Sequence, residues 1–263
     1  MPFGAITEYI DVAQLVLYVF WIFFAGLIFY IRREDKREGY PLESDRTANT
    51  SRVTVQGFPA MPKPKRFLLP DGSTYFAPNN ERDERPVPAE PAGNFPGAPL
   101  IPTGDPMKDG IGAASYAQRH DIPEMTWHNE PKILPISAAE GWNVVDGDPD
   151  PRGMDVYCVD GEKAGTVKEI WIDVPEQIIR YLEVECGTDQ ASKRSLVPFF
   201  LTTIKGNARK KWVNVKSVTA GQFKDAPTVK SKSQITRLEE DKIMGYFGGG
   251  HLHAMPERAE PLV

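Results

Sequence analysis

The 263-residue chain carries a net charge of −5 and only two cysteines, and these features exclude several classes of protein. An acidic balance argues against nucleic acid as the main partner, and two cysteines supply neither a disulfide framework nor a metal-binding cysteine cluster. We expect reduced thiols at Cys158 and Cys186, and room for one sizeable domain with extensions.

Residues 12–31 form an uncharged apolar segment, VAQLVLYVFWIFFAGLIFYI. As a helix rising about 1.5 Å per residue, it spans roughly 30 Å, the thickness of the hydrocarbon core of a bilayer. Thirteen of its residues are Val, Leu, Ile or Phe, and together they favour membrane insertion by about 4–8 kcal/mol. A cleaved signal peptide is the alternative, but it needs a basic n-region and a small-residue cleavage site. The segment therefore predicts a single transmembrane helix.

The flanks of this segment predict its orientation. Glu8 and Asp11 precede it, and four basic residues follow it: Arg32, Arg33, Lys36 and Arg37. Lys and Arg flanking a membrane helix stay on the cytoplasmic side. We expect a periplasmic N-terminus (residues 1–11) and a cytoplasmic remainder.

Residues 32–132 predict an extended, proline-rich segment. Phe58 to Pro106 contains 12 of the 24 prolines, a density that excludes long helices and central strands. A short hairpin is compatible with it: Arg66–Leu69 pairing with Thr74–Phe76 across Asp71-Gly72. The segment is either a disordered linker or, as its aromatic residues favour, an extended stretch laid on a partner's surface.

From residue 133 onwards the sequence predicts a mainly-β domain that ends with a helix near residue 247. Short β-type runs joined by Gly/Asp turns are typical of a small antiparallel barrel or sandwich; they are residues 154–159, 166–174, 178–186, 195–204 and 210–218. Trp212, Val213, Val215 and Val218 are expected in the core. Residues 236–247 predict a helix that Gly248–Gly250 ends, followed by a tail (248–263).

No nucleophile elbow, phosphate loop, dinucleotide fingerprint or zinc helix occurs in the sequence. His251 and His253 fit an exposed turn better than a metal site. Titratable residues gather instead near turns, at 121–130, at 173–180 and at 225–242. These groups are either solvated loops or a proton relay, in which carboxylates and His with different pKa values pass protons through water.

The chain resembles the H subunit of the photosynthetic reaction centre of purple bacteria. The resemblance rests on motifs spread from about residue 6 to residue 258: FWIFFAGLIFY (20–30), REDKREGYPLE (33–43), PTGDPMKDG (102–110), the 165–185 block with DVPEQ (173–177), and LEEDK (238–242). It implies one transmembrane helix, an extended linker and a cytoplasmic PRC-barrel domain (133–247).

The resemblance also implies a role without an enzymatic activity. The H subunit binds no pigment; it caps the cytoplasmic face of the L and M subunits and stabilises the assembly in the bacterial inner, intracytoplasmic membrane. The complex holds bacteriochlorophyll, bacteriopheophytin, quinones, a non-haem iron and carotenoid. The implied neighbours are the light-harvesting 1 antenna, a cytochrome c donor or subunit, and membrane lipids, with no nucleic acid.

Carried over by motif, the resemblance implies a path for protons to the secondary quinone. Glu176 is expected nearest the quinone pocket, Asp173 beside it, and Arg180 compensating their charge. The proton uptake region corresponds to His128 with Asp121 and Glu124. The family has a second His where this chain has Glu130, and it can have an acidic residue where this chain has Thr126. The sequence therefore departs from the family pattern at the proton uptake region. Glu240 of LEEDK completes the expected set.

A different class of function fits the same sequence. A single-pass anchored PRC-barrel that docks another complex, as a scaffold or assembly factor, would have no proton-transfer role. Bacteriochlorophyll absorbance in the purified complex would distinguish a reaction-centre subunit from such a factor.

Overall fold

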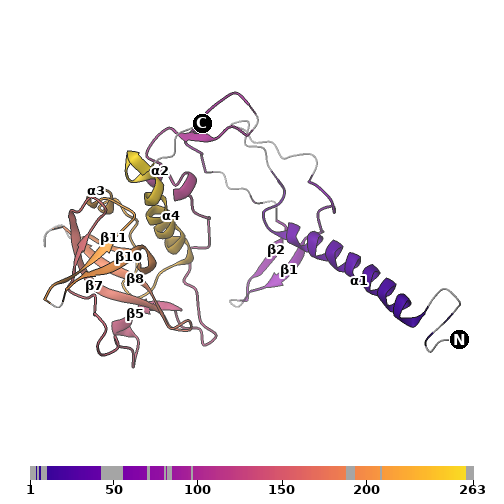
Figure 1. The fold of residues 1–263 in the computed structure, drawn as a ribbon, viewed down its shortest axis with the longest axis horizontal. Coiled ribbons are helices and arrows are strands. Elements are labelled where there is room, and N and C mark those ends of the chain that lie inside the picture. Colours follow the sequence, from indigo (N-terminus) through magenta and orange to yellow (C-terminus); the bar gives the residue numbers. More distant parts are fainter. Residues whose placement is uncertain are drawn as a thin grey trace. The chain divides into compact units, whose positions relative to one another are not determined.

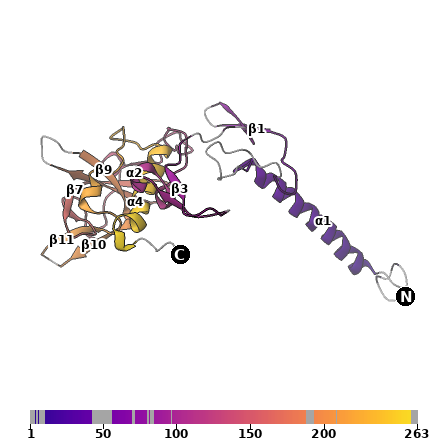
Figure 2. The ribbon, with the colours of Figure 1, turned by 90° about the horizontal axis from the view of Figure 1, so that it is seen from above.

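The computed structural model divides the chain into two compact units, Met1–Glu84 and Arg85–Val263. It describes residues 4, 6, 11–42, 56–69, 72–79, 81, 85–95, 97–187, 193–207 and 209–258. Figures 1 and 2 show the elements of each unit in two views. Most of the predicted N-terminal segment 1–11 and the end of the predicted tail lie outside the described residues.

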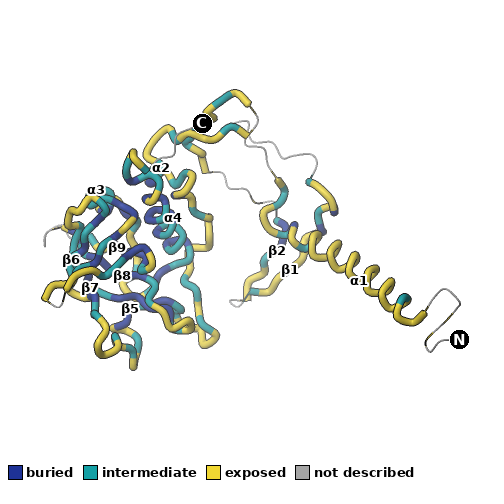
Figure 3. The backbone as a smooth tube through the Cα atoms, viewed as in Figure 1, coloured by how far each residue is buried: buried dark blue, intermediate teal, exposed yellow. Residues whose placement is uncertain are grey.

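The first unit is built on helix α1 (Val12–Glu34), as the apolar segment predicts. Asp11 caps its first turn, where the Asp11 side chain accepts a hydrogen bond from the Gln14 backbone N–H at 2.7 Å. None of its residues is buried (Figure 3). A long, apolar helix with no protein covering it suits a lipid environment.

The predicted hairpin follows in the same unit and is confirmed. Strands β1 (Lys65–Leu68) and β2 (Thr74–Ala77) pair antiparallel. The 3₁₀ turn η1 (Asp35–Arg37) holds this hairpin against the end of α1, because the Arg37 guanidinium donates to the backbone oxygens of Lys63 and Ala77 and forms an ion pair with Glu34 at 2.7 Å.

The second unit is organised around a seven-stranded sheet in the order β10-β11-β6-β7-β8-β9, with β5 pairing with β7. The strands are β5 (Ile133–Pro135), β6 (Asp155–Tyr157), β7 (Lys163–Asp173), β8 (Ile178–Cys186), β9 (Lys193–Pro198), β10 (Thr202–Gly206) and β11 (Lys211–Val215). The predicted mainly-β domain is therefore present, and its long central strands β7 and β8 carry the site described below.

Two details of the predicted sheet are wrong. The run 195–204 is two strands, because Pro198 has no backbone N–H to continue a ladder and the 3₁₀ turn η4 (Phe199–Leu201) follows it. The sheet is also not wholly antiparallel, since β11 pairs with β6 in parallel. The η4 turn connects β9 and β10, the two end strands of the sheet order, which do not pair with each other among the described residues.

The core of this unit lies between the sheet and helix α4 (Arg237–His253). Its largest fully buried side chains are Trp171, Tyr181, Phe223 and Phe247. Val213, Val215 and Val218 are buried as expected, and Trp212 is half-buried, with its ring edge-on to Tyr157.

Both cysteine thiols lie in this core, where burial raises the pKa of Cys158 to about 12 and that of Cys186 to about 11. Because the thiolate is the reactive form, a disulfide reagent at pH 8 should label neither residue in the folded chain and both after unfolding. Absorbance of the released aromatic thiol measures this. Rapid labelling of the native chain would contradict the packing of these two positions.

Helix α4 extends beyond its predicted end at Phe247, and the prediction that Gly248–Gly250 ends it is wrong. The exposed turn expected at His251 and His253 is wrong for the same reason, because both residues lie in the last turn of α4. Gly249 lies against Ala114 and Gly250 against Ser217, so closely that a Cβ on either would lie 2.5–2.6 Å from an atom of its neighbour. Because they have no side chain, these glycines allow the segments that contain Ala114 and Ser217 to pack directly on α4.

The segment before β5 is mostly irregular, as its prolines require. Its short elements are β3 (Ala89–Pro91), β4 (Leu100–Pro102), α2 (Pro106–Asp109) and η2 (Gly112–Ala114), and η3 (Ile136–Ala138), α3 (Ala220–Phe223) and η5 (Pro256–Arg258) occur later in the unit. Both α2 and η2 pack on α4 (Figure 1). Part of the predicted surface-lying segment thus lies on its own chain, and contact with a partner stays a prediction.

Candidate proton-transfer site

The pairing of β5 with β7 brings Lys132 to the end of β7. Ile133 is opposite Asp173, and the Val174 backbone N–H donates to the Lys132 oxygen at 3.1 Å. Lys132 thereby lies beside the turn that joins β7 to β8, which holds the predicted residues Asp173 and Glu176.

The Lys132 ammonium is surrounded by carboxylates. Its Nζ lies 2.9 Å from Glu176 Oε1, 3.4 Å from Asp173 Oδ2 and 3.8 Å from Glu124 Oε2. The hydrogen bond to Glu176, with the charges of Asp173 and Glu124, raises the pKa of Lys132. We call these four residues the Lys132 cluster.

Asp173 is fully buried and fixes the turn on which Glu176 lies. Its Oδ1 accepts a hydrogen bond from the Glu176 backbone N–H at 3.1 Å, and Gln177 adopts a positive φ of 57°. Its Oδ2 is also buried and has no hydrogen-bond partner among the described residues. The Lys132 ammonium at 3.4 Å is thus an electrostatic neighbour of Oδ2 without hydrogen-bond geometry.

A second group of polar side chains lies between β8 and α4. The Tyr181 hydroxyl donates to Glu240 Oε2 at 3.0 Å, and Arg180 Nη2 lies 3.7 Å from the same oxygen. Burial raises the pKa of Glu240, against the opposing effects of Tyr181 and Arg180. We call these three residues the Glu240 group.

The two groups interact, and they shift carboxyl pKa values in opposite directions. Lys132 lowers the pKa of Glu176 through their hydrogen bond, whereas burial raises that of Glu240. The charges of Glu124 and Lys132 also act on Glu240. Neighbouring carboxyls with separated pKa values can serve as proton acceptor and proton donor respectively.

The predicted uptake residues His128 and Glu130 lie in a tight exposed loop, residues 125–131, directly before Lys132. The Thr126 backbone N–H donates to the Glu130 oxygen at 2.7 Å, and the Thr126 side chain accepts hydrogen bonds from both backbone N–H groups, of His128 and of Glu130. The side chains of His128 and Glu130 form no hydrogen bond or ion pair with another described residue. They are open to water and to protons.

Asp121 lies apart from these groups, at the start of α4. Its carboxylate accepts hydrogen bonds from Lys230 and from Thr236, the N-cap residue of α4, and these bonds lower the pKa of Asp121. Such a tightly paired carboxylate is a poor proton acceptor, and its bond to the Thr236 hydroxyl fixes the residue that caps α4.

The structure therefore brings together most of the predicted residues but changes the role of one. Lys132, which the sequence analysis missed, is the main cation beside Asp173 and Glu176, and Arg180 acts on Glu176 more weakly while lying against Glu240. Tyr181 was missed too. The position of Lys132 just before a short β run was the only available signal for it, because the register of β5 is a tertiary feature.

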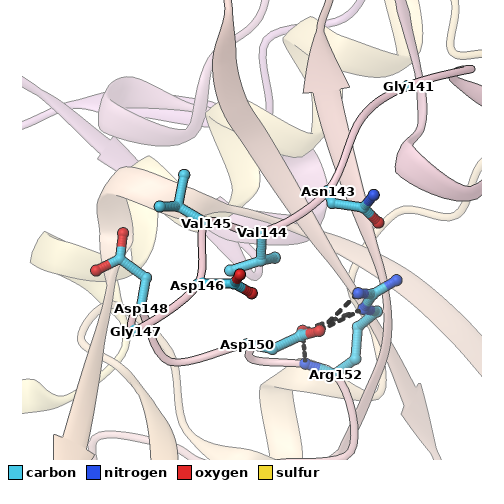
Figure 4. A pocket seen from close by; sticks show the side chains of 9 residues that line it. All are labelled: Gly141, Asn143, Val144, Val145, Asp146, Gly147, Asp148, Asp150 and Arg152. Carbon is cyan, nitrogen blue, oxygen red and sulfur yellow. Dashed lines mark hydrogen bonds and ion pairs between the residues drawn. The ribbon is translucent and has the colours of Figure 1, made fainter.

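A hollow of about 610 Å³ is lined by residues between 141 and 152, none of which belongs to the Lys132 cluster or the Glu240 group (Figure 4). Asp150 and Arg152 form a 2.6 Å ion pair at one end of it, and Asp148 lies at the other. It contains none of the predicted proton-path residues. The described residues hold no group of three or more His, Cys, Asp or Glu that could bind a metal ion.

Two family matches cover most of the chain. Residues 4–138, just over half of the 263, match the family described as "Photosynthetic reaction centre, H-chain N-terminal region". Residues 144–221 match the PRC-barrel domain, and this match spans strands β6 to β11. The Lys132 cluster draws Glu124 and Lys132 from the first matched region, and Asp173 and Glu176 from the second.

Proposed function

Because the chain belongs to the reaction-centre H-chain family, we propose that it caps the cytoplasmic face of the L and M subunits and conducts protons to the secondary quinone. Membership makes it a non-catalytic subunit of a photosynthetic reaction centre, associated with L and M, with one apolar helix as its anchor and a PRC-barrel domain. The proposal concerns what that domain does in the complex.

The observation that carries the proposal is the Lys132 cluster, in which one ammonium lies within 3.8 Å of the carboxylates of Glu176, Asp173 and Glu124 and whose charges also act on Glu240. A doubly reduced quinone takes up two protons in a water-poor site, so acid and base groups must be positioned to deliver them. Lys132 keeps Glu176 ionised, so Glu176 is available as a base and passes on a proton readily once it has taken one up. Glu240, whose pKa burial raises, holds a proton closer to neutral pH.

The route that we propose begins at the exposed loop 125–131. There the exposed His128 side chain collects protons from water together with Glu130 and Glu124. The protons pass to Glu176 and Asp173, while Lys132 and Arg180 keep the carboxylates from repelling one another. Glu240 and Tyr181 form a second branch of the proton route beside the Lys132 cluster. Asp121 has a structural role in this scheme, because it holds Thr236, the N-cap residue of α4.

The remaining expectations from the family resemblance are part of the same proposal. The N-terminus is periplasmic, and the domain after α1 is cytoplasmic, in the bacterial inner membrane. The L and M subunits hold the bacteriochlorophyll, bacteriopheophytin, quinones, carotenoid and non-haem iron, and this chain holds none. Light-harvesting 1 and a cytochrome c are further neighbours. Pigment absorbance that co-purifies with the full-length chain tests the association.

Glu176→Gln should slow proton-coupled transfer of the second electron to the secondary quinone by about tenfold or more, because a positioned acid–base group contributes roughly 10²–10⁴-fold and Glu240 remains. Primary charge separation should be unchanged. Flash-induced absorbance changes and proton uptake measured with a pH dye report both steps in the intact complex.

The matched control is Glu162→Gln, in the exposed turn between β6 and β7. It alters the charge of the domain equally and should leave the second transfer unchanged. Normal kinetics in Glu176→Gln would refute the proton route and leave the scaffold function as the better account.

A further inference from the structure

Lys36 is almost completely buried, although it directly follows the apolar helix α1. Its ammonium donates to the backbone oxygens of Gln56 at 2.7 Å and Pro59 at 2.5 Å, and it lies 5.3 Å from the centre of the Tyr40 ring. A buried ammonium is costly unless its donors find acceptors. Here it fastens residues 56–59 to the end of the helix.

The backbone of this short segment is built for the contact. Gly57 has a φ of +76°, and a Cβ there would lie 3.5 Å from Lys36 Nζ. The Gln56 side chain accepts from the Leu42 backbone N–H and donates to the Leu42 oxygen. Residues 56–59 are thus held both by the Lys36 ammonium and by the backbone of Leu42.

The segment presents Phe58 to the side of α1. The Phe58 ring centre lies 5.8 Å from that of Phe29, and Phe58 is otherwise 83% exposed. Phe29 lies within the apolar residues, three positions and therefore about 4.5 Å before Arg32, given the rise of a helix. Phe58 consequently lies level with the last apolar turn of the helix.

We propose that Phe58, held by Lys36 against Phe29, is a second membrane contact of this chain, with its ring in the boundary between lipid headgroups and acyl chains. The surface continues that of the membrane-spanning helix, and the ring has no polar atom that water could satisfy. Phe, like Trp and Leu, is a residue by which peripheral segments insert into the boundary between headgroups and acyl chains. With Phe58 in the boundary, the contact sets the depth at which α1 ends.

A nitroxide spin label on Phe58→Cys, in the full-length chain in phosphatidylcholine nanodiscs, tests the proposal. Cys158 and Cys186 are 2% and 3% exposed, so the introduced cysteine takes the label. Oxygen concentrates in lipid, so we expect it to broaden the spectrum of the label at position 58. A water-soluble nickel chelate should have little effect on that spectrum. Labels at Ile22→Cys in α1 and at Trp127→Cys, 97% exposed in the wild type, give the lipid and water references.

Two further variants separate the lipid contact from simple misfolding. Lys36→Met removes the donors to Gln56 and Pro59, so the label at position 58 should become accessible to the nickel chelate. Lys63→Met, on the exposed surface, should leave the label shielded from nickel. Phe58→Trp keeps an aromatic ring and should add quenching by brominated lipid above the wild-type signal. Two outcomes would overturn the proposal. The label at position 58 could be as accessible to nickel as the label at position 127, or it could be shielded from both oxygen and nickel when the other subunits are bound.

Discussion

Replacing Lys132 by Met should destabilise the β-domain by about 3 kcal/mol, the lower end of the range for removing one partner of a buried ion pair. Asp173 is fully buried, and its Oδ2 has no hydrogen-bond partner among the described residues and lies 3.4 Å from the Lys132 ammonium. Lys132 is 20% exposed, so water offsets part of the loss. In a domain of this size, the melting temperature should fall by about 6–12 °C, measured by near-ultraviolet circular dichroism of the full-length chain.

Two variants distinguish this cause from a general loss of surface charge. Lys132→Met with Asp173→Asn removes the uncompensated carboxylate and should recover most of the stability. Lys168→Met breaks a more exposed pair with Glu185 at 2.7 Å and should cost less than about 1 kcal/mol. Equal effects of Lys132→Met and Lys168→Met would mean that Asp173 is not held by Lys132.

The same substitution connects stability with function. The hydrogen bond from Lys132 is the largest cause of the lowered pKa of Glu176, so its loss should move that pKa back towards the ordinary range. Proton uptake by the complex should then shift to higher pH, because Glu176 would remain protonated over a wider pH range. A structural role alone would leave the pH profile unchanged.

The sequence is most informative where the physics is local. Twenty uncharged residues before a basic cluster are sufficient to predict α1, and alternating apolar residues indicate β7 and β8. Strands β1 and β2 pair as the Asp71-Gly72 dipeptide predicts, although Asp71 itself lies outside the described residues.

The missed features depend on long-range register. Lys132 gains its importance only because Ile133 pairs with Asp173, forty residues later in the chain. The parallel pairing of β6 with β11 is equally non-local. Gly248–Gly250 were misinterpreted for the same reason: a glycine that ends a helix and one that admits a neighbouring backbone have the same local sequence. The basic flank predicts only an orientation from Lys36, whereas the backbone oxygens that accept its hydrogen bonds lie 20 and 23 residues later in the chain.

Gly249→Ala should destabilise the domain by about 1–3 kcal/mol, the usual cost of overpacking. A Cβ at Gly249 would lie 2.5 Å from Ala114 Cβ, 2.7 Å from Ala114 Cα and 2.9 Å from its backbone N. Backbone atoms cannot rotate away as a flexible side chain can, so α4 and η2 must separate. Thermal unfolding of the full-length chain measures the loss.

Gly248→Ala is the matched control, because a Cβ at Gly248 meets nothing within 4 Å. Within a helix Ala is favoured over Gly by about 1 kcal/mol, and the half-buried Gly248 leaves room for the methyl group, so this variant should raise the melting temperature while Gly249→Ala lowers it. Opposite shifts from adjacent glycines would follow from packing of η2 on α4. Shifts of the same sign would mean that α4 does not bind residues 112–114 as described.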